Sequence, residues 1–107
     1  MKIYIAGKIT GLPIGKVIVK FDNAEFILRY KYRDAEIINP IKLAMELERR
    51  RTGNLDNFPS LERHQYLAYS IKHLLDCTHI YLIEDWKDSE GAKLEVELCR
   101  YFGIHIL

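Results

Sequence analysis

The spacing of hydrophobic and polar residues predicts strands and helices that alternate along the whole chain. Short runs of β-branched and aromatic residues predict strands at Lys2–Ala6, Ala35–Pro40, His79–Ile83 and Ile104–Leu107. Apolar residues at helical spacing predict helices at Lys16–Tyr32, Leu43–Arg51, Leu61–Asp76 and Ser89–Phe102. This alternation indicates a parallel sheet covered by helices on both faces. We therefore expect a small doubly wound α/β domain, flavodoxin-like or Rossmann-like, with about four strands.

The first predicted helix has the least regular pattern. Its apolar residues fall only roughly at helical spacing, at Val19, Ala24, Phe26, Ile27 and Tyr30. The β-branched run Val17–Val19 leaves the start of this helix open, because such side chains favour strands over helices.

The predicted fold indicates where a ligand would bind. In open α/β sheets, ligands bind beyond the carboxyl ends of the strands, at the point where the strand order reverses. The predicted loops at this edge are Gly7–Gly15, Asn39–Lys42 and Glu84–Ser89. We therefore expect the substrate-binding residues, Asn39 among them, in or next to these segments.

Length, composition and charge narrow the class of protein. A chain of 107 residues with 49% hydrophobic residues forms a single globular domain, residues 1–107. The net charge of +1 gives no general reason to expect a nucleic acid or a membrane surface as partner. The first apolar run is too short for a signal peptide, and no segment reaches the length of a membrane span. The cysteines, Cys77 and Cys99, lie in apolar segments, which indicates reduced thiols in a cytoplasmic protein.

Candidate chemistry comes from the start of the last predicted helix. Ser89 is a suitable N-cap, because its hydroxyl can accept a hydrogen bond from an early backbone amide. Gly91 and Glu95 stand four residues apart and therefore share one helix face. A glycine in a helix costs about 1 kcal/mol relative to alanine. We therefore expect something to approach the backbone closely at Gly91.

Glu95 differs from the neighbouring Glu97 in its surroundings. Glu97 has Lys93 and Arg100 at helical spacing, the ordinary pattern of a solvated, ion-paired face. At the same spacings Glu95 has glycine, alanine, leucine and cysteine, so partial burial can raise its pKa and leave it reactive. The alternative is that Glu95 is a solvated surface residue and Gly91 a packing accommodation, which is the commoner case for so short a pattern.

Other candidate signals have simpler interpretations. The Gly7–Gly15 segment lacks the glycine spacing of a phosphate-binding or dinucleotide-binding loop. His73, Cys77 and His79 are potential metal ligands, but a fourth ligand is missing from the pattern. Arg49–Arg51 has no interleaved aromatic residues, so we interpret it as a solvated face at a helix C-terminus. We predict no metal, no cofactor and no nucleic acid partner.

Segments along most of the chain resemble a known superfamily. "IYIAG" at the start and "SEGAKLE" near the end together resemble the nucleoside 2-deoxyribosyltransferase superfamily, which includes deoxynucleoside-monophosphate N-glycosidases. With "INPI" and "CTHIYLIEDW" added, the chain looks most like a small domain-of-unknown-function family found in phages and bacteria. The resemblance implies a nucleoside 2-deoxyribosyltransferase-like domain that assembles as a homo-oligomer.

The resemblance also implies roles for individual residues. Glu95 matches the nucleophile of the superfamily, and Tyr4 matches the tyrosine whose hydroxyl orients that carboxylate. Ser89 matches a residue that binds a 5′-phosphate beside a helix N-terminus. Gly7 and Lys8 match the loop that shapes the sugar pocket.

The implied reaction is attack by Glu95 on C1′ of the 2-deoxyribosyl group of a nucleoside or its 5′-monophosphate. Water would then complete a hydrolysis, and a second base would complete a transfer. Trp86, just before the last predicted helix, could cover the base by stacking. The small-molecule partner is therefore expected to be a nucleoside or nucleotide.

The chain departs from the superfamily at two aspartates, whose places hold Ser70 and Thr78. Serine cannot act as a general acid for the leaving base at ordinary pH. Spacing singles out no substitute among the remaining candidates, Asp76, Asp85 and Asp88. Three hypotheses remain: an N-glycosidase or deoxyribosyltransferase-like enzyme, a non-catalytic nucleotide-binding module, and a structural or interaction role without nucleotide binding.

Overall fold

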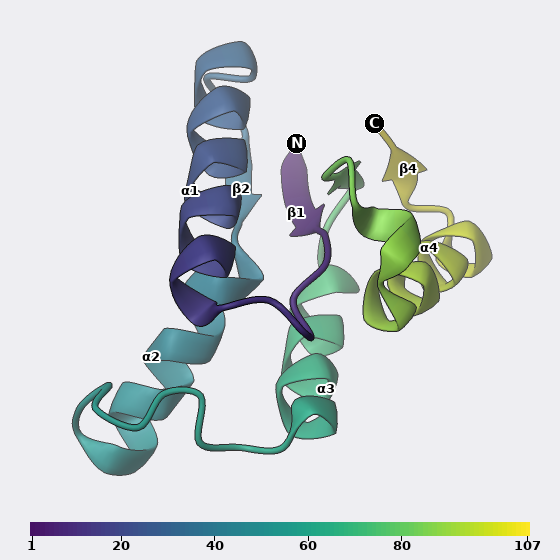
Figure 1. The fold of residues 1–107 in the computed structure, drawn as a ribbon. Coiled ribbons are helices and arrows are strands. Elements are labelled where there is room, and N and C mark those ends of the chain that lie inside the picture. Colours follow the sequence, from purple (N-terminus) through teal and green to yellow (C-terminus); the bar gives the residue numbers. More distant parts are fainter.

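The computed structural model describes all residues, 1–107, as alternating strands and helices (Figure 1). The strands are β1 (Lys2–Ala6), β2 (Glu36–Ile38), β3 (His79–Leu82) and β4 (His105–Ile106). The helices are α1 (Ile14–Lys31), α2 (Pro40–Thr52), α3 (Arg63–Leu74) and α4 (Glu90–Phe102), with a short 3₁₀ helix, η1 (Trp86–Asp88), before α4. All strand pairs are parallel, and the order across the sheet is β2-β1-β3-β4.

Alternate side chains of β1 enter two separate cores, one on each face of the sheet. Ile3 and Ile5 pack into a cluster with residues of α1, while Tyr4 and Ala6 pack into a cluster with residues of α3 and α4. This is the period of two expected of a buried strand. Figure 1 shows α1 and α4 on opposite sides of β1. The predicted doubly wound α/β fold with a parallel sheet and helices on both faces is confirmed.

The second helix begins earlier than predicted. It starts at Pro40, because Asn39 caps it: the Asn39 side-chain oxygen accepts bonds from the backbone N–H groups of Ile41 and Lys42 at 3.0 and 3.4 Å. Proline suits the first helical position, where its missing N–H is not needed. The prediction of a loop at Asn39–Lys42 is therefore wrong. The other boundaries lie within two residues of those predicted.

The first helix buries a different face from the one its apolar pattern suggested. Of the apolar residues noted there, only Ala24 is buried, and the larger ones are exposed: Val19, Phe26, Ile27 and Tyr30. The buried face instead consists of Val17, Phe21, Ala24, Glu25 and Leu28. A buried glutamate at its centre made this face look polar in the sequence.

None of the helices combines the length and the apolar character that crossing a bilayer requires.

Candidate functional site

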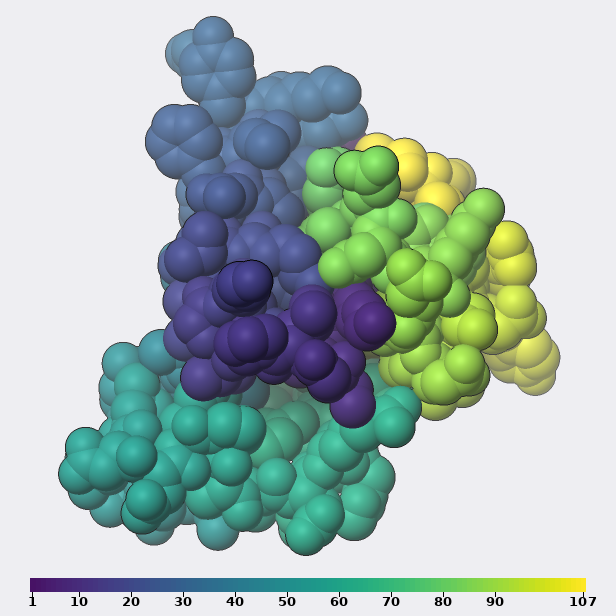
Figure 2. Space-filling view, viewed as in Figure 1, coloured from purple at the N-terminus to yellow at the C-terminus, as the bar shows by residue number.

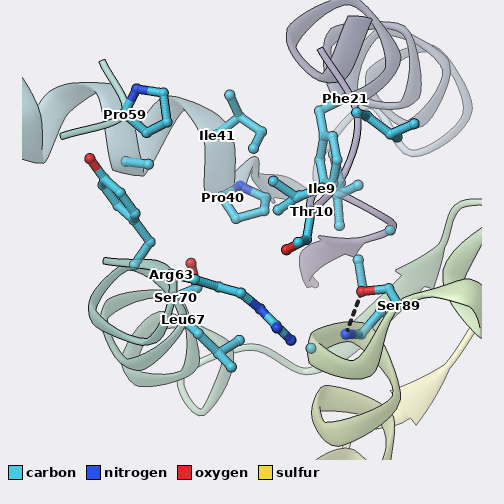
Figure 3. Close-up of a pocket in the computed structure, with 18 of the residues that line it drawn as sticks. Ile9, Thr10, Phe21, Pro40, Ile41, Pro59, Arg63, Leu67, Ser70 and Ser89 are labelled. Carbon is cyan, nitrogen blue, oxygen red and sulfur yellow. Dashed lines mark hydrogen bonds between the residues drawn. The ribbon is translucent and has the colours of Figure 1, made fainter. Parts of the chain in front are cut away.

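A cavity of about 500 Å³ lies between the carboxyl end of β1 and the start of α4, the helix that follows the neighbouring strand β3. The sheet order places these strands side by side although α1, β2, α2 and α3 separate them in sequence, which makes this the point where strand order reverses. The wall comes from the β1–α1 loop, the start of α2, the α2–α3 loop, α3 and the first turns of α4 (Figure 3). The volume is within the usual range for small-molecule sites.

Tyr4 and Glu95 meet at the wall of this cavity. Tyr4 stands in the middle of β1 and is 1% exposed, and Glu95 lies on the sheet-facing side of α4 and is 5% exposed. Both line the cavity, together with the buried Ser70 of α3. Burial, the negative charge of Glu95 and the interaction with its carboxylate raise the pKa of Tyr4 well above its ordinary value. Tyr4 therefore stays a neutral hydroxyl.

The carboxyl group of Glu95 is poorly solvated. Its Oε2 is buried without a hydrogen-bond partner. Burial raises the pKa of Glu95 to about 7, although hydrogen bonding by the neighbouring Tyr4 lowers it in part. A carboxyl with this pKa is substantially ionised at neutral pH and remains basic, which are the properties of a nucleophile or a general base.

Ser89 and Gly91 form the cavity wall at the start of α4. Ser89 is the N-cap, as predicted, and its Oγ accepts a bond from the Ala92 N–H at 3.1 Å (Figure 3). A Cβ at Gly91 would lie 3.5 Å from Leu67, an ordinary contact. The expected close approach is therefore not made by any protein atom, and the open side of Gly91 is the cavity itself.

Comparison with known proteins gives a family for the whole chain. A family model described as "Domain of unknown function (DUF4406)" matches residues 1–107. The chain belongs to this family. No curated protein and no solved structure matches it.

In this DUF4406 domain, Gly7 lies where the predicted loop leaves β1, and it lines the cavity. A Cβ there would lie 3.0 Å from Cβ and Cδ1 of Ile83 and 3.3 Å from Oδ1 of Asp85. These contacts are tight, so a side chain at this position requires Ile83 and Asp85 to shift. Glycine allows the two loops to approach closely beside the cavity without that shift.

Three of the predicted binding residues lie outside the cavity of the DUF4406 domain. The side chain of Asn39 is buried and is occupied by the α2 cap and by a bond to Glu25 at 3.1 Å. The Lys8 peptide is bonded to side chains behind the loop, and Lys8 is not part of the cavity wall. Trp86 packs against the core between the sheet and α4. The structure gives these residues no contact with the cavity.

Arg63 is a candidate binding residue that the sequence analysis missed. It lines the cavity, and Figure 3 shows its guanidinium pointing toward the start of α4, where Ser89 lies. Arg63 is the first residue of α3, at the positive end of the helix dipole, where a cation is unfavourable. The sequence could have indicated Arg63 as a binding residue, because an arginine is unfavourable at a helix start and the first turn of α3 holds no acidic residue that would compensate.

Glu95 is the only carboxylate in the cavity wall of the DUF4406 domain. The other candidate acids, Asp76, Asp85 and Asp88, do not reach it. No three His, Cys, Asp or Glu side chains come together in a way that could hold a metal ion. The site therefore combines one buried carboxyl with a raised pKa, one tyrosine hydroxyl, one serine-capped helix start and one arginine.

Proposed function

We propose that the protein is a distant relative of the nucleoside 2-deoxyribosyltransferases and cleaves or transfers the base of a deoxynucleoside 5′-monophosphate, with Glu95 as nucleophile. The observation that carries the proposal is the unpartnered Oε2 of Glu95 at the wall of a cavity. A buried polar group without a partner destabilises a fold. Its presence beside a cavity is explained if a ligand supplies the partner.

The proposed reaction begins with attack of a Glu95 oxygen on C1′ of the deoxyribosyl group. The new C–O bond forms as the C1′–N bond breaks, and the base leaves with the bonding electron pair. The base takes its proton from water, because no second carboxyl lies in the cavity wall. Water, or a second base, then attacks C1′ and releases the Glu95 carboxylate.

The 5′-phosphate is proposed to bind at the start of α4. The first backbone N–H groups of a helix and its dipole attract anions. The Ser89 hydroxyl accepts from Ala92, so its own proton is free to donate to a phosphate oxygen. The guanidinium of Arg63 points toward the same place in Figure 3 and makes no ion pair with a protein carboxylate.

Base release tests the proposed function. Wild type is incubated with a panel of deoxynucleosides and their 5′-monophosphates, and free base is followed by chromatography. Glu95→Gln is the test variant, and Glu97→Gln is the matched control, because Glu97 is exposed on the same helix and pairs with Arg100 at 2.9 Å. We expect release by wild type and Glu97→Gln only. Equal release by Glu95→Gln would contradict the nucleophile role.

Arg63→Met separates the phosphate site from the reaction itself. We expect it to raise KM for the monophosphates by roughly 10-fold to 100-fold, the loss of a charged hydrogen bond, and to leave KM for the nucleosides unchanged. Arg100→Met, which removes an exposed arginine of α4, is the control. An equal effect of Arg63→Met on both substrate classes would place the phosphate elsewhere.

The alternative function is a non-catalytic nucleotide-binding module. It is favoured by Ser70, which occupies the cavity wall where the resemblance to the superfamily expects an aspartate. Ser70→Asp distinguishes the two hypotheses, because it adds a carboxyl beside Tyr4 and Glu95 that can protonate the leaving base. Base release that increases in this variant supports an enzyme limited by its missing acid. Nucleotide binding without release in either protein supports the module.

A homo-oligomer is the remaining proposal from the resemblance. Its support is the exposed apolar surface of α1, formed by Val19, Phe26, Ile27 and Tyr30. Light scattering tests it, and a monomer at high protein concentration would contradict it.

A further inference from the structure

The β1–α1 loop, residues 7 to 13, forms one wall of the cavity. Gly7, Ile9, Thr10, Gly11 and Leu12 all line it. Figure 3 shows Ile9 and Thr10 extending from this loop over the cavity, and Figure 2 shows the loop, in purple, at the surface between the teal α2–α3 region and the green start of α4. The position of this loop therefore determines how the cavity closes.

An ion pair holds this loop at the backbone N–H and C=O groups of one residue, Lys8. Oδ1 of Asp85 accepts the Lys8 N–H at 3.0 Å, and Oδ2 accepts from Nζ of Lys20 at 2.6 Å. Lys20 also donates to the Lys8 carbonyl oxygen. Asp85, Lys20 and the Lys8 peptide thus form a closed ring of hydrogen bonds, which we call the Lys8 clamp.

The clamp joins three separate parts of the fold. Lys8 follows β1, Lys20 lies in α1, and Asp85 follows β3, so the ring closes across the point where the strand order reverses. The side chains of Lys20 and Asp85 are only 22% and 29% exposed. Although burial acts to raise it, the pKa of Asp85 is lowered by the bonds from Lys20 and from the Lys8 N–H. The Asp85 carboxylate therefore remains ionised at neutral pH.

We propose that Asp85 and Lys20 are positioning residues that hold the loop against the substrate in the cavity. The inference rests on the proposed function for its ligand, a deoxynucleoside 5′-monophosphate. The clamp grips the backbone immediately before Ile9 and Thr10, whose side chains extend into the cavity (Figure 3). Because it touches neither Glu95 nor Tyr4, it acts on substrate binding and not on the nucleophile.

The effect of the clamp on the loop itself is measured by hydrogen exchange without any ligand. Asp85→Asn and Lys20→Met are expected to speed amide exchange of residues 9 to 12 about tenfold or more, because the loop opens more often. Lys20→Arg keeps the positive charge and can still reach the Asp85 carboxylate and the Lys8 carbonyl oxygen. Its amide exchange rates in the loop are therefore expected to stay within about threefold of wild type. The control is Lys2→Met, which removes an ion pair with Glu36 at 3.4 Å at the other end of the sheet.

The effect on the reaction is measured by steady-state base release from the monophosphate. Loss of binding energy present in both ground and transition states raises KM and leaves kcat unchanged. We expect KM to rise about tenfold or more in Asp85→Asn and Lys20→Met, with kcat within about threefold of wild type and the pH dependence of kcat unchanged. Lys20→Arg is expected to restore KM.

Two results would overturn the inference. Unchanged loop exchange in Asp85→Asn and Lys20→Met would show that the clamp does not hold the loop. Faster exchange with unchanged KM would show that the loop does not position substrate, which leaves a purely structural ion pair. If wild type neither cleaves nor binds a monophosphate, the proposed function and this role toward a nucleotide fail together, while the exchange rates still decide whether the clamp holds the loop.

Discussion

Glu25 and Glu95 are both buried glutamates, each 5% exposed, but their surroundings are opposite. Glu25 on α1 receives bonds from Arg29 at 2.7 Å, Lys42 at 2.9 Å and Asn39 at 3.1 Å. Glu95 on α4 has an Oε2 without any hydrogen-bond partner. One carboxyl is therefore surrounded by donors, and the other faces a cavity.

The pKa values of the two carboxyls move in opposite directions. Burial alone would raise both, but the bonds from Lys42, Arg29 and Asn39 lower the pKa of Glu25. Burial raises the pKa of Glu95 to about 7. Glu25 thus holds α1 to α2 as an anion, whereas Oε2 of Glu95 has no partner that would hold its charge. Burial of a carboxylate does not by itself indicate a functional site, so the proposed role of Glu95 rests on its unpartnered oxygen beside a cavity.

The largest expected difference between the two carboxyls is in activity. Glu95→Gln is expected to lower kcat for base release by roughly 10³-fold or more, because an amide cannot act as the nucleophile. Glu25→Gln makes the same change in side-chain size and charge, and its kcat is expected to stay within about threefold of that of wild type. Rates are compared under conditions in which circular dichroism shows each variant folded. Similar losses in both variants would point to folding and not to chemistry.

The second expected difference is the sign of the stability change. A rise in pKa from 4.5 to about 7 corresponds to roughly 3 kcal/mol of destabilisation when Glu95 is ionised. Glu95→Gln is therefore expected to stabilise the fold by about 1 to 3 kcal/mol at pH 8.5, the lower value allowing for an unpaired amide. Glu25→Gln is expected to destabilise it by about 2 kcal/mol, because charged hydrogen bonds are lost. Urea unfolding measures both changes in unfolding free energy. Changes of the same sign in the two variants would contradict the proposed difference between Glu95 and Glu25.

The pH dependence of the unfolding free energy also distinguishes Glu95 from Glu25. Glu95 has a raised pKa in the folded state, so its burial carries no penalty below pH 4.5, and the penalty grows as pH rises through about 7. Glu25 has a lowered pKa, so its contribution is present above its ordinary value of 4.5 and is lost as pH falls below it. The difference in unfolding free energy between wild type and Glu95→Gln is expected to change with pH only above pH 4.5, where Glu95 begins to ionise in the unfolded chain. Equal differences at pH 4 and pH 8.5 would contradict the raised pKa.

The smallest expected effect concerns Gly91. Gly91→Ala puts a methyl group 3.5 Å from Leu67, an ordinary contact, but on the cavity side of α4. Helix propensity and chain entropy are expected to stabilise the fold by about 0.4 to 1 kcal/mol, while KM rises. Gly15→Ala is the matched control, because Gly15 is also the second residue of a helix and has open space around it. A gain in stability with unchanged KM would mean that no ligand approaches Gly91.

The fold was largely predictable because strand and helix periods are local signals. The failures have local causes as well. Asn39 and Pro40 were interpreted as the end of a strand, although together they are a helix cap and a first helical residue. The buried face of α1 was missed because Glu25 is neutralised by Lys42, which lies far along the chain. No period along α1 can show such a partner.

The candidate site was predictable only in part, for the same reason. The helix pattern indicated the unusual surroundings of Glu95, whereas the pairing of Glu95 with Tyr4 came from the resemblance to the superfamily and not from the periodicity of the strand. Trp86 was placed by its position in the sequence alone, and in the structure it is half-buried and packs against the core instead. The Lys20–Asp85 pair depends on a contact between distant elements, which the sequence does not display. For Arg63 the sequence offered only its unfavourable position in the first turn of α3, and not its place in the cavity wall.

We propose that Glu95 is a reactive carboxyl whose partner is a bound ligand, whereas Glu25 is a structural carboxyl. The most direct test is an NMR titration of protein with ¹³C-labelled glutamate side chains, assigned with Glu95→Gln and Glu25→Gln. We expect the Glu95 carboxyl to titrate near pH 7 and Glu25 below 4.5, and a deoxynucleoside 5′-monophosphate to move the Glu95 signal alone. A Glu95 midpoint near 4.5 that no nucleotide changes would contradict the account.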